Sequence, residues 1–195
     1  MGTGRMAAFS DGVLAIVITI MVLGLKVPEA TNLAALQSLV PVLLSYLLSF
    51  IYIGIYWNNH HHLLHAVKRV NGPVLWANLH LLFWLTLIPF ATAWVGENYS
   101  AAVPTALYGV VLLLSALAYY ILAHAFITLH GRSSALANSL GSDLKNKLSV
   151  AMYVAAILLA FLSPWIAEVL YVAVAAIWFI PDRRIERSLE LQNHL

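Results

Sequence analysis

Six long apolar segments take up most of this 195-residue chain, and they restrict it to a helical fold inside a lipid bilayer. Hydrophobic residues make up 62% of the sequence and charged residues 9%, whereas soluble domains carry about 25% charged residues. A membrane-spanning helix needs about 20 apolar residues, so each segment predicts one. The predicted helices cover residues 7–26, 35–57, 74–95, 101–128, 147–163 and 165–181. Together they predict an all-α integral membrane protein with a single domain over residues 1–195.

The last two segments are short and are separated mainly by Ser163-Pro164. Proline cannot continue the backbone hydrogen-bond ladder, so this stretch forms either a tight helical hairpin or one long kinked helix. Each half approaches spanning length, which favours the hairpin. Pro89 lies well inside the third segment and predicts a kink there.

Lysine and arginine are distributed unequally between the loops. With six spans, nine of the ten fall on the side of the two termini, and Lys26 falls on the other side. The nine are Arg5, Lys68, Arg69, Arg132, Lys145, Lys147, Arg183, Arg184 and Arg187. Cytoplasmic loops carry an excess of basic residues, so both termini are expected to be cytoplasmic. Merging the last two segments would place the C-terminal arginines outside, so the distribution also favours six spans.

Asp11 stands where the first apolar segment begins. A charged residue in a membrane helix is costly, so Asp11 is expected to have a partner or a function. Arg5 is six residues earlier and cannot face it on the same helix, so a partner must come from elsewhere. Polar side chains at a compatible depth are Ser10, Trp57, Asn58, Asn59, His60 and His61. A polar cluster formed there would fix the orientation of the first helix.

Helical geometry places three apolar side chains of the first segment in one narrow stripe. At about 100° per residue, Ile20 lies about 40° and Leu23 about 20° from Ile16 around the helix axis. Thr19 lies on the shoulder of the stripe, about 60° from Ile16. The stripe by itself fits a surface that faces lipid, the bundle core or a pore. Asp11 lies about 140° from Ile16 and is expected to point into its own bundle.

The other polar residues do not form a recognisable enzyme site. The run His60-His61-His62-x-x-His65 places His61 and His65 on one helix face, but no second ligand cluster accompanies it, so no metal is expected. The sequence has no cysteine, no phosphate-binding loop, no Gly-x-Ser-x-Gly elbow and no nucleic-acid motif. A channel without cofactors or a nucleic-acid partner is the favoured interpretation. The alternatives are a proton-coupled transporter or proton-conducting protein using Asp11 and the histidines, and a metalloenzyme built on the histidine run.

The opening motif Arg5-x-x-x-Phe9-Ser10-Asp11 resembles the signature of the transmembrane protein 175 family, whose members are potassium channels of animal endolysosomes and of bacteria. The stretch Gly12-Val13-x-Ala15-Ile16 and the exit Val22-Leu23-x-Leu25-Lys26-Val27-Pro28 are similar to the bacterial members. So are Ser49-Phe50, Trp57 and His60-His61 in the second segment. The similarity extends to the six-helix layout of the whole chain.

The resemblance implies a homotetramer in a bacterial inner membrane, because members with one six-helix unit form tetramers. The first helix of each subunit would line a central pore. Ile16, five residues after the motif aspartate, takes the place of the family's main constriction. Ile20 and Leu23 would form the next apolar rings, and Thr19 matches a threonine ring connected with selectivity. The motif Arg5-x-x-x-Phe9-Ser10-Asp11 would hold the pore helix in place.

Such a pore predicts an unusual form of potassium selectivity. The sequence contains no Thr-Val-Gly-Tyr-Gly loop, and the stripe holds no Asp or Glu. A carbonyl filter and an acidic ring are therefore not expected, and a narrow apolar ring gates by dewetting instead. When open, it favours cations that lose their water readily, which gives a modest preference for potassium over sodium. The expected partners are further copies of the chain, membrane lipids and permeant monovalent cations.

Overall fold

The computed structural model of the chain describes residues 2–65, 67, 69–131 and 144–179, and the regular structure of these residues is α-helical. The helices are α1 (Thr3–Leu23), α2 (Leu33–Gln37), α3 (Val40–His65), α4 (Gly72–Thr86), α5 (Ile88–Glu97), α6 (Ala102–His130), α8 (Leu144–Leu159) and α9 (Pro164–Phe179). Five of the basic residues counted above lie outside the described part, namely Lys68, Arg132, Arg183, Arg184 and Arg187.

Four spans in the described part are long and apolar enough to cross a membrane. They are α1, α3, α6 and the stretch Gly72–Glu97 that combines α4 and α5. Helices α8 and α9 have 16 residues each. The described part of each is about 24 Å long at 1.5 Å per residue, against about 30 Å for the hydrocarbon core, and each adjoins residues outside the described part. The structure therefore confirms an all-helical protein with membrane-length helices, while the count of six spans stays a prediction.

Helices α1 and α3 continue through polar residues that the apolar segments leave out. Helix α1 begins at Thr3 rather than at residue 7, so Asp11 lies in its third turn and not at its N-terminus. Helix α3 ends at His65, eight residues beyond the predicted end, and includes the whole histidine run. Hydropathy marks the membrane core, whereas a helix ends where its backbone ladder is interrupted. Both helices therefore extend beyond the predicted apolar segments at these ends.

The kink predicted at Pro89 is present as a break between α4 and α5. Leu87 separates the two helices, and its amide bonds the Trp84 carbonyl at 3.1 Å in a tightened last turn. Pro89 is the second residue of α5, where its missing amide hydrogen is tolerated best. Helices α4 and α5 on the two sides of this break both contact α1.

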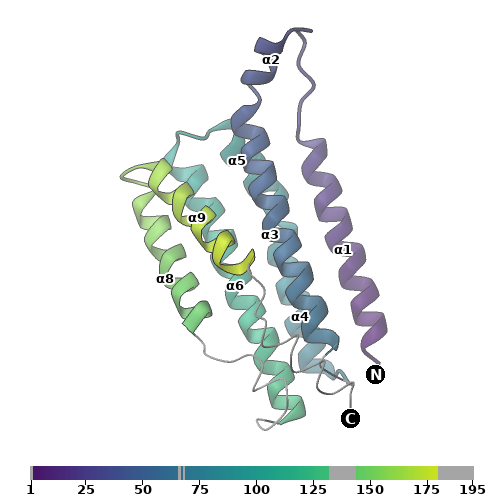
Figure 1. The fold of residues 1–195 in the computed structure, drawn as a ribbon. Coiled ribbons are helices and arrows are strands. Elements are labelled where there is room, and N and C mark those ends of the chain that lie inside the picture. The colour runs from purple at the N-terminus through teal and green to yellow at the C-terminus, as the bar shows by residue number, and fades with distance from the viewer. Residues whose placement is uncertain (1, 66, 68, 132–143, 180–195) are drawn as a thin grey trace.

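Helix α6 packs against α4, α5, α8 and α9, whereas α1 packs against α3, α4 and α5. Figure 1 shows the consequence: α1 lies at one edge of the bundle and the α8–α9 pair at the opposite edge. Helices α8 and α9 contact each other and are joined by a short turn before Pro164, so the predicted hairpin is confirmed. The first helix therefore has one side against its own subunit and one side free.

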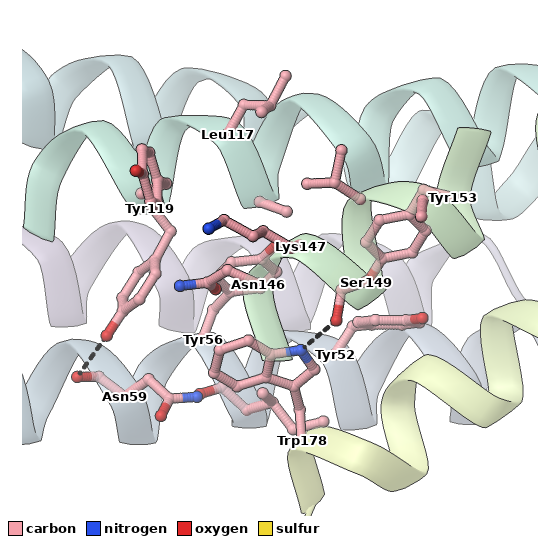
Figure 2. A pocket seen from close by; sticks show the side chains of 15 residues that line it. Tyr52, Tyr56, Asn59, Leu117, Tyr119, Asn146, Lys147, Ser149, Tyr153 and Trp178 are labelled. Atoms are coloured by element: carbon pink, nitrogen blue, oxygen red, sulfur yellow. Dashed lines mark hydrogen bonds between the residues drawn. The ribbon is translucent and has the colours of Figure 1, made fainter. Parts of the chain in front are cut away.

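The α8–α9 edge encloses a cavity of about 320 Å³ among α3, α6, α8 and α9, and α1 contributes no residue to its described lining. Figure 2 shows the tyrosine and tryptophan side chains that surround it. Trp178 donates a hydrogen bond to Ser149 at 2.8 Å, and the Tyr119 hydroxyl donates to the Asn59 carbonyl at 3.4 Å. These bonds satisfy the polar tips of large rings, so the aromatic core holds this edge together.

Candidate functional site

Helix α1 presents two different faces. Its buried face consists of Met6, Ser10, Leu14, Val17 and Met21, which point toward α3, α4 and α5. On the opposite face, Ile16 is 58% exposed, Ile20 50% and Leu23 81%. The predicted stripe is therefore left uncovered by its own subunit, and any contact that it makes must come from another copy, from lipid or from a pore.

The stripe borders a groove of about 580 Å³ between α1 and the α4–α5 break. Ile16 and Ile20 line one wall, and Thr86, Pro89 and Phe90 line the other. Pro89, the second residue of α5, lies directly in the wall of this groove. The groove leaves room beside the stripe for a neighbouring helix or for solvent.

Thr19 is exposed beside the stripe. Its hydroxyl donates a hydrogen bond to the Ile16 carbonyl at 2.9 Å. With its hydrogen turned back to the helix, the hydroxyl oxygen keeps its acceptor lone pairs. An oxygen in this state can accept a hydrogen bond from water or contact a cation.

Asp11 lies on the flank of α1 that meets α3. The Trp57 indole donates to its carboxylate at 3.0 Å, and the Trp57 ring lies 5.7 Å from that of His61. Asp11 is exposed, but its carboxylate reaches α3, where Trp57 is the partner on another helix that the sequence predicted. Angular position alone places it away from the stripe but does not distinguish a buried face from the flank between two helices.

Ser10, the residue before Asp11, is the one that enters the core. It is fully buried and accepts a hydrogen bond from the Asn78 amide at 3.0 Å. The Asn78 carbonyl oxygen accepts from the His60 ring at 2.8 Å, and both residues are 2% exposed. This chain of bonds, the Ser10–Asn78–His60 network, joins α1, α4 and α3.

Sequence reasoning named Ser10 and His60 as polar candidates but missed Asn78, which connects them. The available signal was an amide side chain between Ala77 and Leu79 in an otherwise apolar segment. A polar group in a membrane helix requires a partner on another helix, so this position could have been identified.

Replacing Asn78 by leucine is expected to destabilise the subunit. The substitution keeps the volume but leaves the buried His60 ring and the Ser10 hydroxyl without their partner, at a cost of about 1–3 kcal/mol. The thermal unfolding midpoint of the detergent-purified protein should fall by about 5 °C.

The matched control for this substitution is Asn58→Leu. Asn58 is half-buried on α3 and forms no hydrogen bond with a described residue, so its loss should leave the midpoint nearly unchanged. Replacing Ser10, Asn78 and His60 together by apolar residues should recover part of the lost stability, since no polar group is then left unpaired. Equal midpoints for Asn78→Leu and the wild type would show that the network does not stabilise the fold.

A second buried network lies farther along α1, beside Met21. The Thr92 hydroxyl donates to Ser49 at 2.7 Å, and Ser49 is 2.9 Å from the Tyr108 hydroxyl. It joins α5, α3 and α6 and was not predicted, because single hydroxyl residues in apolar segments give no distinct pattern. The two networks hold the helices that support α1 at two different depths.

Comparison with known proteins shows the family to which this chain belongs. The family model described as endosomal/lysosomal potassium channel TMEM175 matches residues 5–89. A potassium channel of Chryseobacterium sp. (strain P1-3) is 55% identical over 190 residues, which make up 97% of this chain and 99% of that protein. This chain belongs to the TMEM175 family.

The family assignment extends to the fold. A crystal structure of a lysosomal potassium-selective channel TMEM175 homologue from Chamaesiphon minutus matches with a TM-score of 0.80 and 30% identity, covering 92% of this chain and 97% of that one. The endosomal/lysosomal proton channel TMEM175 of Danio rerio is 25% identical over 66% of this chain, which corresponds to 25% of that longer protein.

The remaining motif residues of this TMEM175-family chain lie on the uncovered side of α1. Arg5 and Phe9 are both exposed, about 20° on either side of Ile16, and Arg5 forms no ion pair with a described residue. Within the motif, Ser10 is therefore buried in the core and Asp11 lies where α1 meets α3. Arg5 and Phe9 lie on the exposed side of α1.

In the part of the chain that the structure describes, no group of three or more histidine and carboxylate side chains converges at the histidine run. His65 donates through Nδ1 to the His61 carbonyl at 3.0 Å, and the two rings lie 4.1 Å apart. His80 accepts a bond from Trp84 on its own helix at 3.0 Å.

Proposed function

We propose that this TMEM175-family chain forms a potassium channel whose pore is lined by the uncovered face of α1. The observation that carries the proposal is that Ile16, Ile20 and Leu23 form an apolar stripe on a membrane-length helix, and their own subunit leaves the stripe open. The relative that matches the whole chain at 55% identity is named a potassium channel. A channel accounts for both facts, since copies of α1 around an axis would enclose the stripe.

The proposed assembly is a homotetramer. Two sets of bulky exposed apolar residues flank α1, one on α3 and one on α4 and α5. The first set is Leu43, Phe50 and Trp57; the second is Trp76, Leu79, Phe83 and Phe90. In a closed ring, one set of each copy packs against the other set of the next copy. That packing would leave α1 innermost and give Arg5 and Phe9 a neighbouring copy to contact.

The proposed constriction is the ring of Ile16 side chains, extended by Ile20 and Leu23. A narrow apolar ring excludes water when closed and passes only ions that shed part of their hydration shell when open. Potassium loses its water more readily than sodium, so a modest potassium preference follows without a carbonyl filter. The Thr19 oxygen beside the ring would contact the partly dehydrated ion. No cofactor takes part, and the monovalent cations are the cargo.

The remaining expectations concern topology. We propose six spans in a bacterial inner membrane, with α8 and α9 as the fifth and sixth and both termini cytoplasmic. The described basic residues Arg5, Arg69, Lys145 and Lys147 lie at helix ends that point to one end of the bundle, and Lys26 lies beyond the opposite end of α1. This distribution supports the orientation through the preference of basic loops for the cytoplasm.

The test of the function is cation flux into proteoliposomes that contain the wild-type protein. Potassium gradients should drive large flux, sodium gradients less, and N-methyl-glucamine none. The similar proteins of Danio rerio and Bos taurus are named endosomal/lysosomal proton channels, so proton conduction is the second candidate function. Flux that saturates and requires a pH gradient would favour that candidate, and absence of flux in folded, inserted protein would reject the channel.

Asp11 is proposed to fix α1 against α3 through its bond to Trp57. Asp11→Ala removes both the acceptor and the charge and should reduce the fraction of assembled protein about fivefold, as expected for a loss of about 1 kcal/mol. Asp11→Asn keeps an oxygen acceptor for the indole and should assemble better. The readout is the tetramer fraction in size-exclusion chromatography. A fully assembled, normally conducting Asp11→Ala protein would contradict the role.

A further inference from the structure

A second apolar groove, which the channel proposal does not use, lies on the side of the bundle formed by α3 and α9. Its volume is about 410 Å³, and it is lined mainly by apolar and aromatic side chains, among them Leu44, Tyr99, Tyr108, Trp165 and Val172, together with Glu168. All of these residues belong to the described part of the chain. Glu168 is the one ionisable carboxylate among them, at the second turn of α9.

The Glu168 carboxylate has no partner within the described residues, where it forms neither a hydrogen bond nor an ion pair. It is half-buried among apolar and aromatic side chains. Glu97 on the same end of the bundle differs, since it is paired with Lys26 at 2.6 Å. An ionisable group in a membrane helix is costly unless it is paired, so Glu168 indicates a binding site for a positive group.

Aromatic rings line the same groove as the carboxylate and favour the same charge. The rings of Tyr99 and Trp165 meet edge-on with centroids 6.0 Å apart, and Trp165 is 59% exposed. Ring faces attract ammonium groups, and none of the lining residues is basic. The Tyr108 hydroxyl is already bonded to Ser49. A headgroup with an anionic end would meet no positive partner here, whereas an ammonium would meet both a carboxylate and π faces.

The rest of the groove is suited to a hydrocarbon chain. Leu44, Leu47 and Val172 line it and are 60%, 52% and 53% exposed, so an acyl chain lying along α3 and α9 would cover them. Trp165 marks the depth of the membrane interface, where amphipathic rings accumulate and where a lipid headgroup also lies. Charge and shape therefore select the same kind of molecule.

We propose that this groove binds one phospholipid per subunit whose headgroup ends in a primary ammonium, as in phosphatidylethanolamine. The ammonium donates to the Glu168 carboxylate beside Trp165, and one acyl chain follows the apolar groove. A primary ammonium has N–H donors, whereas the quaternary ammonium of phosphatidylcholine has none. The site is therefore specific for the first of these two headgroups.

The experiment is native mass spectrometry of the full-length protein in detergent, titrated with phosphatidylethanolamine, phosphatidylcholine or phosphatidylglycerol of identical acyl chains. The wild type should retain phosphatidylethanolamine in preference to the other two. Glu168→Gln should weaken that retention about tenfold, as expected for a lost hydrogen bond to a charged group, and bring it close to the retention of phosphatidylcholine. Glu29→Gln, which alters an exposed carboxylate outside the groove, should behave as wild type.

A second variant tests the groove itself. Val172→Trp fills it without touching the carboxylate, and since Val172 is exposed the protein should fold, as the unfolding midpoint will show. This variant should lose retained lipid of every headgroup. Equal retention of the three lipids by the wild type would overturn the proposal. This result is expected if a second copy of the chain covers the groove. A Glu168→Gln protein that keeps its preference would also overturn it.

Discussion

Ile16→Asn is expected to raise cation flux about tenfold and to reduce the preference for potassium over sodium. Each subunit would exchange a branched apolar side chain for an amide of similar size at the proposed constriction. Water then enters the ring more readily, and lowering the barrier by about 1.4 kcal/mol accounts for a tenfold increase. Sodium gains most, because a hydrated ring no longer requires the ion to lose its water. Potassium and sodium flux in proteoliposomes measure both effects.

Folding should not obscure this result, since Ile16 is 58% exposed within its subunit and contributes little to the core. The matched control is Val22→Asn, which places the same amide at another exposed position of α1, 45% exposed and about 120° from Ile16. It should leave flux and selectivity close to wild type. Unchanged flux and selectivity in Ile16→Asn would reject Ile16 as the constriction.

The features that sequence could predict are those that repeat along one helix. The stripe of Ile16, Ile20 and Leu23 follows from the helical period. The structure places all three on the side of α1 that the other helices leave uncovered. The break near Pro89 follows in the same way from the chemistry of one residue. Such features depend on local geometry, which the order of residues specifies directly.

Contacts between helices could not be predicted with the same success. Ser10 and Asp11 are neighbours in sequence, but their partners are Asn78 and Trp57 on different helices. Which of the two enters the core depends on the rotation of α1 against α3 and α4. That rotation results from the packing of the whole bundle and leaves no pattern within a single segment.

Gly109→Ala is expected to destabilise the subunit more than any other single methyl addition at a described glycine. A Cβ at this position of α6 would overlap the Tyr171 hydroxyl and lie 2.7 Å from Tyr171 Cζ and 2.9 Å from Ile157 Cγ1. Tyr171 cannot withdraw, because it is 1% exposed and its hydroxyl donates to the Thr105 carbonyl at 3.1 Å. Overpacking of this kind costs about 1–3 kcal/mol, so the unfolding midpoint should fall by about 5 °C.

Two comparisons make the Gly109 result specific. Gly54→Ala, which adds the same methyl group to α3 with no heavy atom within 4 Å, should keep or slightly raise the midpoint because alanine is the better helix former. Adding Tyr171→Phe to Gly109→Ala removes the atom that overlaps and should restore part of the stability. An unchanged midpoint in Gly109→Ala would show that α6 and α9 do not approach this closely. Because α9 contacts α3 and α6 rather than α1, the Gly109→Ala protein that does fold should retain wild-type ion selectivity, which separates the support of the bundle from its proposed pore.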